Sequence, residues 1–170
     1  TPDAANASPS ATRPLLTTAL ELHQLTREEA AKNHPAKLRG VVTSTIPTYS
    51  GFTLQDATGG IYAQGDAPVQ VGDFVEIEGV TDPGLFAPIL TSGRITNLGK
   101  GRMPDPIRPP WDQLMNGSLD GEYVELEGIT TSVTTEVVRL LTSGGTIAIH
   151  LQNGVPPGDL KLYEDKRVKI

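Results

Sequence analysis

Apolar and polar residues alternate along residues 52–64, and the alternation is interrupted by a pair of glycines. Because successive side chains of a strand point to opposite faces, this pattern predicts two strands that share one apolar face. The apolar face would carry Phe52, Leu54, Ile61 and Ala63, and the other face would carry Thr53, Gln55, Tyr62 and Gln64. We expect the first set to fill the interior of a sheet and the second set to face solvent.

A tight turn is predicted between these two strands. The carboxylate of Asp56 can accept backbone N–H groups from residues 58–60, as in an Asx turn. Gly59 and Gly60 tolerate the positive φ that such a hairpin requires. We therefore interpret Asp56, Gly59 and Gly60 as structural turn residues.

Local sequence patterns also predict elements before and after the hairpin. Thr26 followed three residues later by Glu29 has the spacing of a capping box, which predicts a short helix over about residues 26–33. Pro35 ends that helix, because its ring disfavours helix in the preceding residue. Further strands, separated by Gly, Pro and Asp turns, are predicted at residues 37–43, 74–80 and about 88–97.

The chain contains an internal repeat. Five residues recur at a constant offset of 88, namely Leu38, Gly40, Val41, Thr43 and Ser44 against Leu126, Gly128, Ile129, Thr131 and Ser132. Val75 and Ile77 match Val168 and Ile170, and Gly59-Gly60 matches Gly144-Gly145. The second copy therefore stops inside its fourth strand.

A five-stranded unit of this size protects its edges best by closing into a small barrel, and the OB-fold is the common solution. Gly40 and Gly128 allow the first strand of each copy to bend. The sequence thus predicts an all-β protein of two tandem five-stranded OB-like barrels, each preceded by a short helix, with the second copy truncated at its C-terminus. The predicted parts are a flexible N-terminal tail (1–17), a first barrel (18–100), a Pro-rich linker (101–110) and an incomplete second barrel (111–170).

Charge and composition argue against several classes of function. The 170 residues carry a net charge of −6 without a basic half, which disfavours nucleic acid as a partner. Cysteine is absent, and His23, His34 and His150 lack metal-ligand spacing, so we expect neither a metal site nor a cofactor. With no nucleophile motif either, we expect no catalysis from this fragment.

The outward face of the hairpin is the candidate contact surface. Tyr62 lies between Gln55 and Gln64, and Arg39 on the first strand would extend the surface. The alternative is a solvated face with one exposed tyrosine. The remaining aromatic residues are scattered and are interpreted as loop anchors or core edges: Tyr49, Phe74 and Phe86.

Four segments carry a family resemblance: LRGVVTS, FTLQDATGGIYAQ, VGDFVEIEGVTDPGLFAPIL and LDGEYVELEGITTSV. Together they resemble the extracytoplasmic N-terminal region of large bacterial membrane-bound sensor histidine kinases, which carries tandem OB-like modules. The resemblance covers about residues 18–170. It implies a non-catalytic sensory or interaction module of a two-component system, on the periplasmic side of the membrane.

In that setting the partners would be other domains or subunits of a membrane receptor, and kinase activity would lie outside this chain. The fragment itself would not insert into the membrane. Two alternatives stay open. One is an oligonucleotide- or oligosaccharide-binding OB-fold protein, and the other is a structural spacer between domains.

Overall fold

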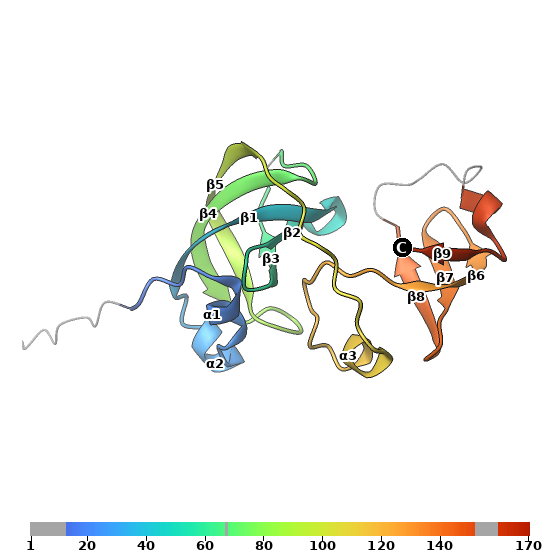
Figure 1. Cartoon of the computed structure of the whole chain (residues 1–170). Coiled ribbons are helices and arrows are strands. Elements are labelled where there is room, and N and C mark those ends of the chain that lie inside the picture. Colours follow the sequence, from blue (N-terminus) through green and yellow to red (C-terminus); the bar gives the residue numbers. More distant parts are fainter. Residues whose placement is uncertain (1–12, 67, 152–159) are drawn as a thin grey trace, which may run out of the picture.

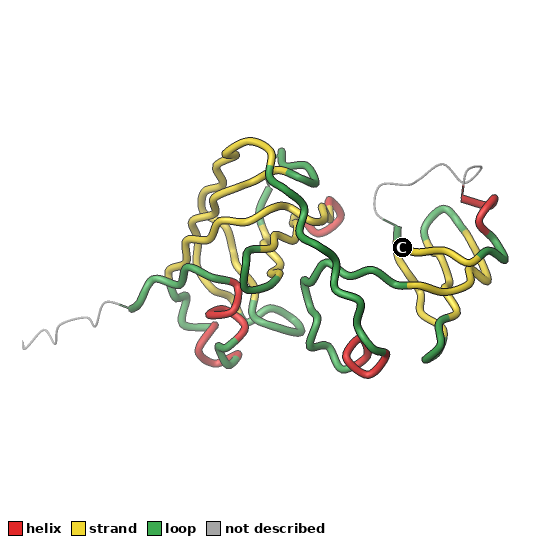
Figure 2. The backbone as a smooth tube through the Cα atoms, in the orientation of Figure 1, coloured by secondary structure: helices red, strands yellow, loops and turns green. Residues whose placement is uncertain are grey.

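The structure, a computed structural model, describes residues 13–66, 68–151 and 160–170. These residues are mostly β, and their strands form two sheets. The two sheets lie at opposite ends of the drawing in Figure 1. Residues 101–126, an irregular stretch with one short helix, connect them, and we call this stretch the joining segment. Figure 2 shows how much of that joining segment is loop.

The first sheet is a closed five-stranded barrel with the strand order β1-β2-β3-β5-β4. Its strands are β1 (Pro35–Ile46), β2 (Gly51–Gln55), β3 (Gly60–Gln64), β4 (Asp73–Asp82) and β5 (Ile89–Lys100). Strand β5 closes the barrel by running parallel to β3 and antiparallel to β4. The five strands predicted for this unit are confirmed, and the closed order is consistent with an OB-like fold.

The barrel interior is filled by the predicted inward side chains. The buried core cluster contains Leu16, Ala19, Leu22, Ala36, Leu38, Val42, Phe52, Leu54, Ile61, Ala63, Val75, Ile77 and Leu90. Two of these, Ala19 and Leu22, lie on a short helix before the barrel, so this helix packs against the core. The period-2 pattern of the hairpin therefore assigned its inward face correctly.

Two short helices precede the barrel, α1 (Ala19–His23) and α2 (Arg27–Ala30). Half of the predicted capping box is present, since the Thr26 hydroxyl accepts the Glu29 N–H at 3.2 Å, while the Glu29 carboxylate contacts Lys32 and His34. Helix α2 ends earlier than predicted. Helix α1 was not predicted, although Thr18 and Glu21 have the same spacing and form a complete capping box.

The expected tail over residues 1–17 falls largely on residues 1–12, which lie outside the described residues. Its last part belongs to the first unit. Leu16 forms a parallel bridge with Ala36, and only 8% of its surface is exposed. The first unit therefore includes Leu16, which the predicted division assigned to the tail.

The second sheet has four strands in the order β8-β7-β6-β9. They are β6 (Glu127–Val133), β7 (Val137–Leu141), β8 (Thr146–His150) and β9 (Arg167–Lys169). Helix α3 (Trp111–Met115), which was predicted, precedes them, and the 3₁₀ turns η1 (Pro47–Tyr49) and η2 (Lys161–Tyr163) complete the elements. Among the described residues these strands form an open sheet, so two five-stranded barrels are not confirmed.

Strand pairing repeats between the two sheets. Gly40 lies opposite Val75, and Gly128 lies opposite Val168. The first strand of each sheet has a register shift at the matching place, between residues 42 and 44 and between residues 130 and 132. The four strands of the second sheet thus correspond in order and register to β3, β2, β1 and β4.

The hairpin turns correspond as well, with a shift of one residue from the sequence alignment. The Asp56 N–H donates to the Gly59 carbonyl at 3.0 Å, and the Thr142 N–H donates to the Gly145 carbonyl at 2.8 Å. Gly59 and Gly145 have φ of 154° and 157°. The counterpart of Gly59 is therefore Gly145, and not Gly144 as the alignment suggested.

One difference between the repeats is a reversal of charge. Arg39 on β1 lies opposite Glu76 on β4, whereas Glu127 on β6 lies opposite Lys169 on β9. Ion pairs cross both strand pairs, including Arg39 with Glu76 at 2.6 Å and Glu127 with Arg167 at 2.6 Å. The first strand is basic in one sheet and acidic in the other.

Candidate functional site

Tyr62 is held on the outer face of β3. Its neighbours Ile61 and Ala63 are buried, and its own side chain is half-buried. The Tyr62 hydroxyl donates to the Tyr49 carbonyl at 3.2 Å, and a Cβ at Gly51 would collide with the tyrosine ring. Burial, with a smaller contribution from Tyr49, raises the pKa of the Tyr62 hydroxyl, which therefore stays a hydrogen-bond donor at neutral pH.

A groove with a volume of about 590 Å³ opens beside Tyr62. It is bounded by η1 after β1, by β2 and β3, and by the loop between β4 and β5. Its lining residues are Ile46, Tyr49, Thr53, Tyr62, Gln64, Asp82, Gly84, Leu85, Phe86, Ala87, Ile89, Asp120 and Gly121. We call it the β2–β3 groove. In OB-folds this face and these two loops form the usual binding surface.

Three aromatic side chains line the β2–β3 groove. Tyr49 is 70% exposed and Phe86 is 69% exposed, while Leu85 beside them is fully exposed. Of the two interpretations that the sequence left open for Tyr49 and Phe86, the core edge is wrong, because both side chains are exposed, whereas both residues do lie in loops between strands. The signal that could have found them is their place in the two loops that flank the central hairpin of an OB-like barrel.

The charged side chains among the described lining residues are both acidic, Asp82 and Asp120. Asp82 also shapes its loop, since its Oδ1 accepts the Gly84 N–H at 2.8 Å. Arg27 supports the same loop from α2 by donating to the Pro83 carbonyl at 3.1 Å. The groove thus combines aromatic surface with negative charge.

The segment that joins the two sheets forms one wall of the groove. Next to that wall, Glu122 accepts the Gly60 N–H at 3.0 Å, and the Tyr123 N–H donates to the Gln55 side chain at 3.0 Å. A Cβ at Gly60 would collide with the Gly121 carbonyl. Gly60 is therefore required for this close approach and not for a positive φ.

The predicted site residues therefore do not all lie in the groove. Tyr62 and Gln64 line the groove, whereas Gln55 binds the joining segment. Asp56 is a turn residue as predicted, because its Oδ1 accepts the N–H groups of Thr58 at 2.6 Å and Gly59 at 3.2 Å. Its Oδ2 also accepts the Ala19 N–H at 2.8 Å, which ties the turn to α1.

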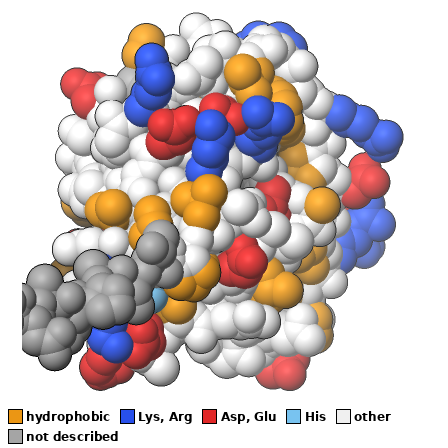
Figure 3. All heavy atoms as spheres, turned by 90° about the vertical axis from the view of Figure 1, so that its left-hand side faces the viewer, with side chains coloured by type: hydrophobic (Ala, Val, Ile, Leu, Met, Phe, Trp, Pro, Cys, Tyr) orange, Lys and Arg blue, Asp and Glu red, His pale blue; other side chains and the backbone are white. Residues whose placement is uncertain are grey.

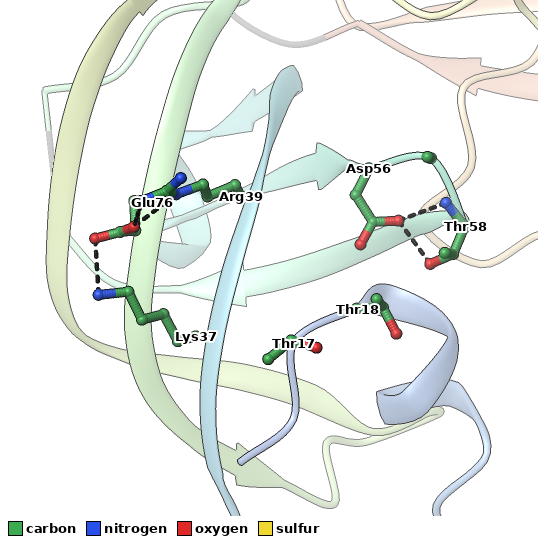
Figure 4. A pocket seen from close by; sticks show the side chains of 8 residues that line it. Thr17, Thr18, Lys37, Arg39, Asp56, Thr58 and Glu76 are labelled. Carbon is green, nitrogen blue, oxygen red and sulfur yellow. Dashed lines mark hydrogen bonds and ion pairs between the residues drawn. The ribbon is translucent and has the colours of Figure 1, made fainter.

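Arg39 lies in a different hollow, of about 430 Å³, which is lined by β1, by β4, by the residues before α1 and by the β2–β3 turn with Asp56 (Figure 4). Glu76 pairs there with Lys37 at 3.1 Å and with Arg39 at 2.6 Å. The hydrogen bond from Lys37, and then that from Arg39, lowers the pKa of Glu76. The structure therefore does not bring Arg39 together with Tyr62.

The hollow offers little net charge to a ligand, because its acids and bases neutralise one another. On the face of the molecule in Figure 3, basic and acidic side chains lie next to each other over the part that the described residues form. Lys37 also reaches Glu78 at 2.6 Å, which raises the pKa of the lysine. We interpret this surface as a network of cross-strand ion pairs.

The parts of the chain that the structure describes contain neither a cluster of metal-binding side chains nor a membrane-spanning helix. Residues 13–66, 68–151 and 160–170 contain no group of three or more His, Asp or Glu side chains arranged to hold a metal ion. Within the same ranges, no helix has the length and apolar character needed to span a bilayer.

Comparison with known proteins does not assign the chain to a family. No protein-family model matches the chain, and no curated protein matches it. Among solved structures, the chain is similar to the hypothetical protein ygiW from E. coli, with 22% identity and a TM-score of 0.39. The similarity covers 53% of this chain and 94% of that protein.

Proposed function

We propose that this chain is a non-catalytic recognition module and that the β2–β3 groove is its binding site. The observation that carries the proposal is the gathering of Tyr49, Tyr62 and Phe86 around one cavity from three separate elements. Its volume of about 590 Å³ lies in the range of small-ligand sites. Exposed apolar groups gathered in one place mark interaction sites on soluble proteins.

The aromatic residues suit recognition because each offers a large, stiff surface at low cost in side-chain entropy. Tyr62 is fixed by its hydrogen bond to the Tyr49 carbonyl, so its ring is oriented before a ligand arrives. Gln64, which is exposed, adds an amide that can donate and accept. The groove therefore supplies flat apolar contacts and directional polar contacts together.

Nuclear magnetic resonance with a neutral aromatic probe tests the binding site. Phenol titrated into ¹⁵N-labelled protein should shift the amide signals of residues 49–51, 62–64 and 84–87 more than other signals. Phe86→Ala should reduce these shifts. Shifts spread evenly over the protein, or unchanged by the substitution, would contradict the assignment of the groove.

We further propose that the module works in the extracytoplasmic, sensory part of a bacterial sensor histidine kinase. The support is the resemblance of residues 18–170 to that region, together with the acidic charge and the internal repeat. Its partners are then the other domains or subunits of the receptor. The gene provides the test, since its reading frame should also encode a membrane-spanning helix and a kinase domain. A frame that encodes neither rejects this setting.

The second unit is proposed to be a second OB-like barrel, of which the described residues form the counterparts of β1 to β4. Its support is the equal register of Gly40 with Val75 and of Gly128 with Val168. An apolar cavity of about 290 Å³, lined in part by Val133, lies in this unit. In the first barrel β5 pairs with both β3 and β4 and completes the enclosure of the core.

An oligosaccharide remains compatible with the groove, since aromatic faces and amides also bind sugars. Oligonucleotides fit less well, because Asp82 and Asp120 would repel phosphates. A structural spacer does not account for the exposure of Tyr49 and Phe86 in the same groove. Phenol binding elsewhere, or nowhere, would favour the spacer.

A further inference from the structure

We propose that the β2–β3 groove binds an organic cation with ammonium groups on a flexible alkyl chain, of the polyamine type. This inference rests on the groove being the recognition site of the module. It specifies the ligand class from charge, aromatic geometry and apolar lining.

The first argument is charge complementarity. Asp82 and Asp120 are the charged side chains among the described residues that line the groove. Neither carboxylate forms an ion pair with another residue of the described chain. This contrasts with Glu76 and Asp73, whose charges are matched by lysine or arginine. A cationic ligand would supply the missing positive charge at neutral pH.

The second argument is the aromatic lining. An ammonium group is attracted to the face of a tyrosine or phenylalanine ring, and the attraction grows as the group loses water. Tyr49, Tyr62 and Phe86 approach the groove from η1, from β3 and from the β4–β5 loop. A cation inside the groove would therefore have aromatic side chains from three elements among its neighbours, and proteins recognise alkylammonium groups with such side chains.

The third argument is the apolar surface of the groove. Leu85 and Ile89 line the groove beside the aromatic rings. A methylene chain removes such surface from water, whereas a metal ion or a small inorganic cation does not. The two carboxylates come from different walls, Asp82 from the end of β4 and Asp120 from the joining segment. A ligand with several ammonium groups can satisfy both.

Isothermal titration calorimetry with spermidine tests this inference. Spermidine should bind the intact 170-residue chain with a one-to-one stoichiometry, and added salt should weaken the binding. Asp82→Asn and Asp120→Asn should each weaken it about tenfold, as expected when a hydrogen bond to a charged group is lost. The asparagine at position 82 keeps the side-chain oxygen that accepts the Gly84 N–H, so the loop is preserved.

Asp105→Asn is the matched control, because it removes the same charge from a side chain that is 93% exposed outside the groove. It should change spermidine affinity less than twofold. An equal loss in Asp82→Asn and Asp105→Asn would show unspecific attraction to an acidic protein and would overturn the proposal. So would the absence of spermidine binding.

A neutral oligosaccharide, cellotetraose, separates this inference from the proposed function. Cellotetraose binding that Phe86→Ala weakens, without any spermidine binding, would keep the groove as a recognition site and reject the cationic ligand. If neither spermidine, cellotetraose nor phenol binds there, both the ligand class and the site are rejected.

Discussion

Gly40 and Gly128 occupy the same position in the two sheets, each pressed against a carbonyl of the neighbouring strand. A Cβ at Gly40 would lie 2.7 Å from the Gln55 carbonyl oxygen, and a Cβ at Gly128 would collide with the Leu141 carbonyl. The close approach lets the first strand of each sheet bend and pair on both sides. The residue after Gly40, Val41, pairs with both β2 and β4.

Substituting these glycines should destabilise their own units. Gly40→Ala and Gly128→Ala should each lower the free energy of unfolding by about 1–3 kcal/mol, because the added methyl meets backbone that cannot move aside. Urea denaturation checks the change. Gly93→Ala is the control, since its added methyl meets the Glu78 carbonyl at 3.4 Å, an ordinary contact. Equal losses in Gly40→Ala and Gly93→Ala would reject the explanation.

A fifth strand next to β8 and β9 should stabilise the second sheet of the 170-residue chain. Since Ile170 corresponds to Ile77, a copy of residues 78–100 fused directly after Ile170 should provide a counterpart of β5. Amide exchange of residues 146–150 and 167–169 should slow, because β8 and β9 gain a partner. A fusion in which the copies of Leu90 and Ile95 are aspartate should not slow exchange. Equal exchange in both fusions would contradict the proposal of a second barrel.

Asp73 should make the first barrel sensitive to acid. It is buried, and its carboxylate accepts hydrogen bonds from Lys100 Nζ at 2.5 Å, from the Gln70 N–H at 2.9 Å and from Asn97 Nδ2 at 3.0 Å. The hydrogen bond from Lys100, followed by that from Gln70, lowers the pKa of Asp73 below its ordinary 3.8.

A lowered pKa in the folded state means that the ionised carboxylate stabilises the fold. This stabilisation is present above pH 3.8 and is lost as the pH falls through the lower pKa of the folded state. Asp73→Asn should be less stable than the parent at pH 7, and the difference should shrink below pH 3.8. Urea midpoints measured between pH 2 and pH 7 give both curves. A difference that does not change with pH would contradict this role.

Glu122 should hold the joining segment against the hairpin turn. Glu122→Ala removes the acceptor of the Gly60 N–H, so exchange of the Gly60 amide should become at least about tenfold faster. The Leu54 amide, inside the barrel, should be unaffected. Glu136→Ala, an exposed substitution in the β6–β7 turn, is the control. Unchanged protection of Gly60 would show that the segment is held by other contacts.

Nucleic acid should not bind. Fluorescence anisotropy with a labelled single-stranded 12-mer should show no association at physiological salt, because the groove and the net charge of −6 are both unfavourable to phosphate. Micromolar binding that weakens steeply as salt is added would contradict the prediction and would favour the oligonucleotide alternative.

The first barrel could be predicted from sequence because local patterns determine most of it. The alternation around Phe52 and Ile61 indicated the inward face, and the five strands were located within a few residues. The second sheet could be predicted as a repeat through Gly128 and Val168, which keep the register of the first. Helix α1 was missed although its capping pair was visible in the sequence.

The candidate site was only partly predictable because it depends on contacts between distant segments. Tyr62 could be placed outside the barrel from its neighbours. Tyr49 and Phe86 join it only after the barrel closes, so their scattered positions were misleading. Gln55 was assigned to the same surface, but a residue 68 positions later, Tyr123, takes its side-chain oxygen. Arg39 was removed from the site by the register of β1 with β4.

The reversed charges of the two sheets bear on how a duplicated chain avoids misassembly while it folds. If β1 paired with β9, Arg39 would face Lys169, and if β6 paired with β4, Glu127 would face Glu76. Like charges directly opposite each other destabilise strand pairs. Repulsion between like charges therefore destabilises both wrong pairings between the copies, while attraction between opposite charges stabilises both correct pairings. Internal duplication would otherwise invite exchange of strands between repeats or between molecules.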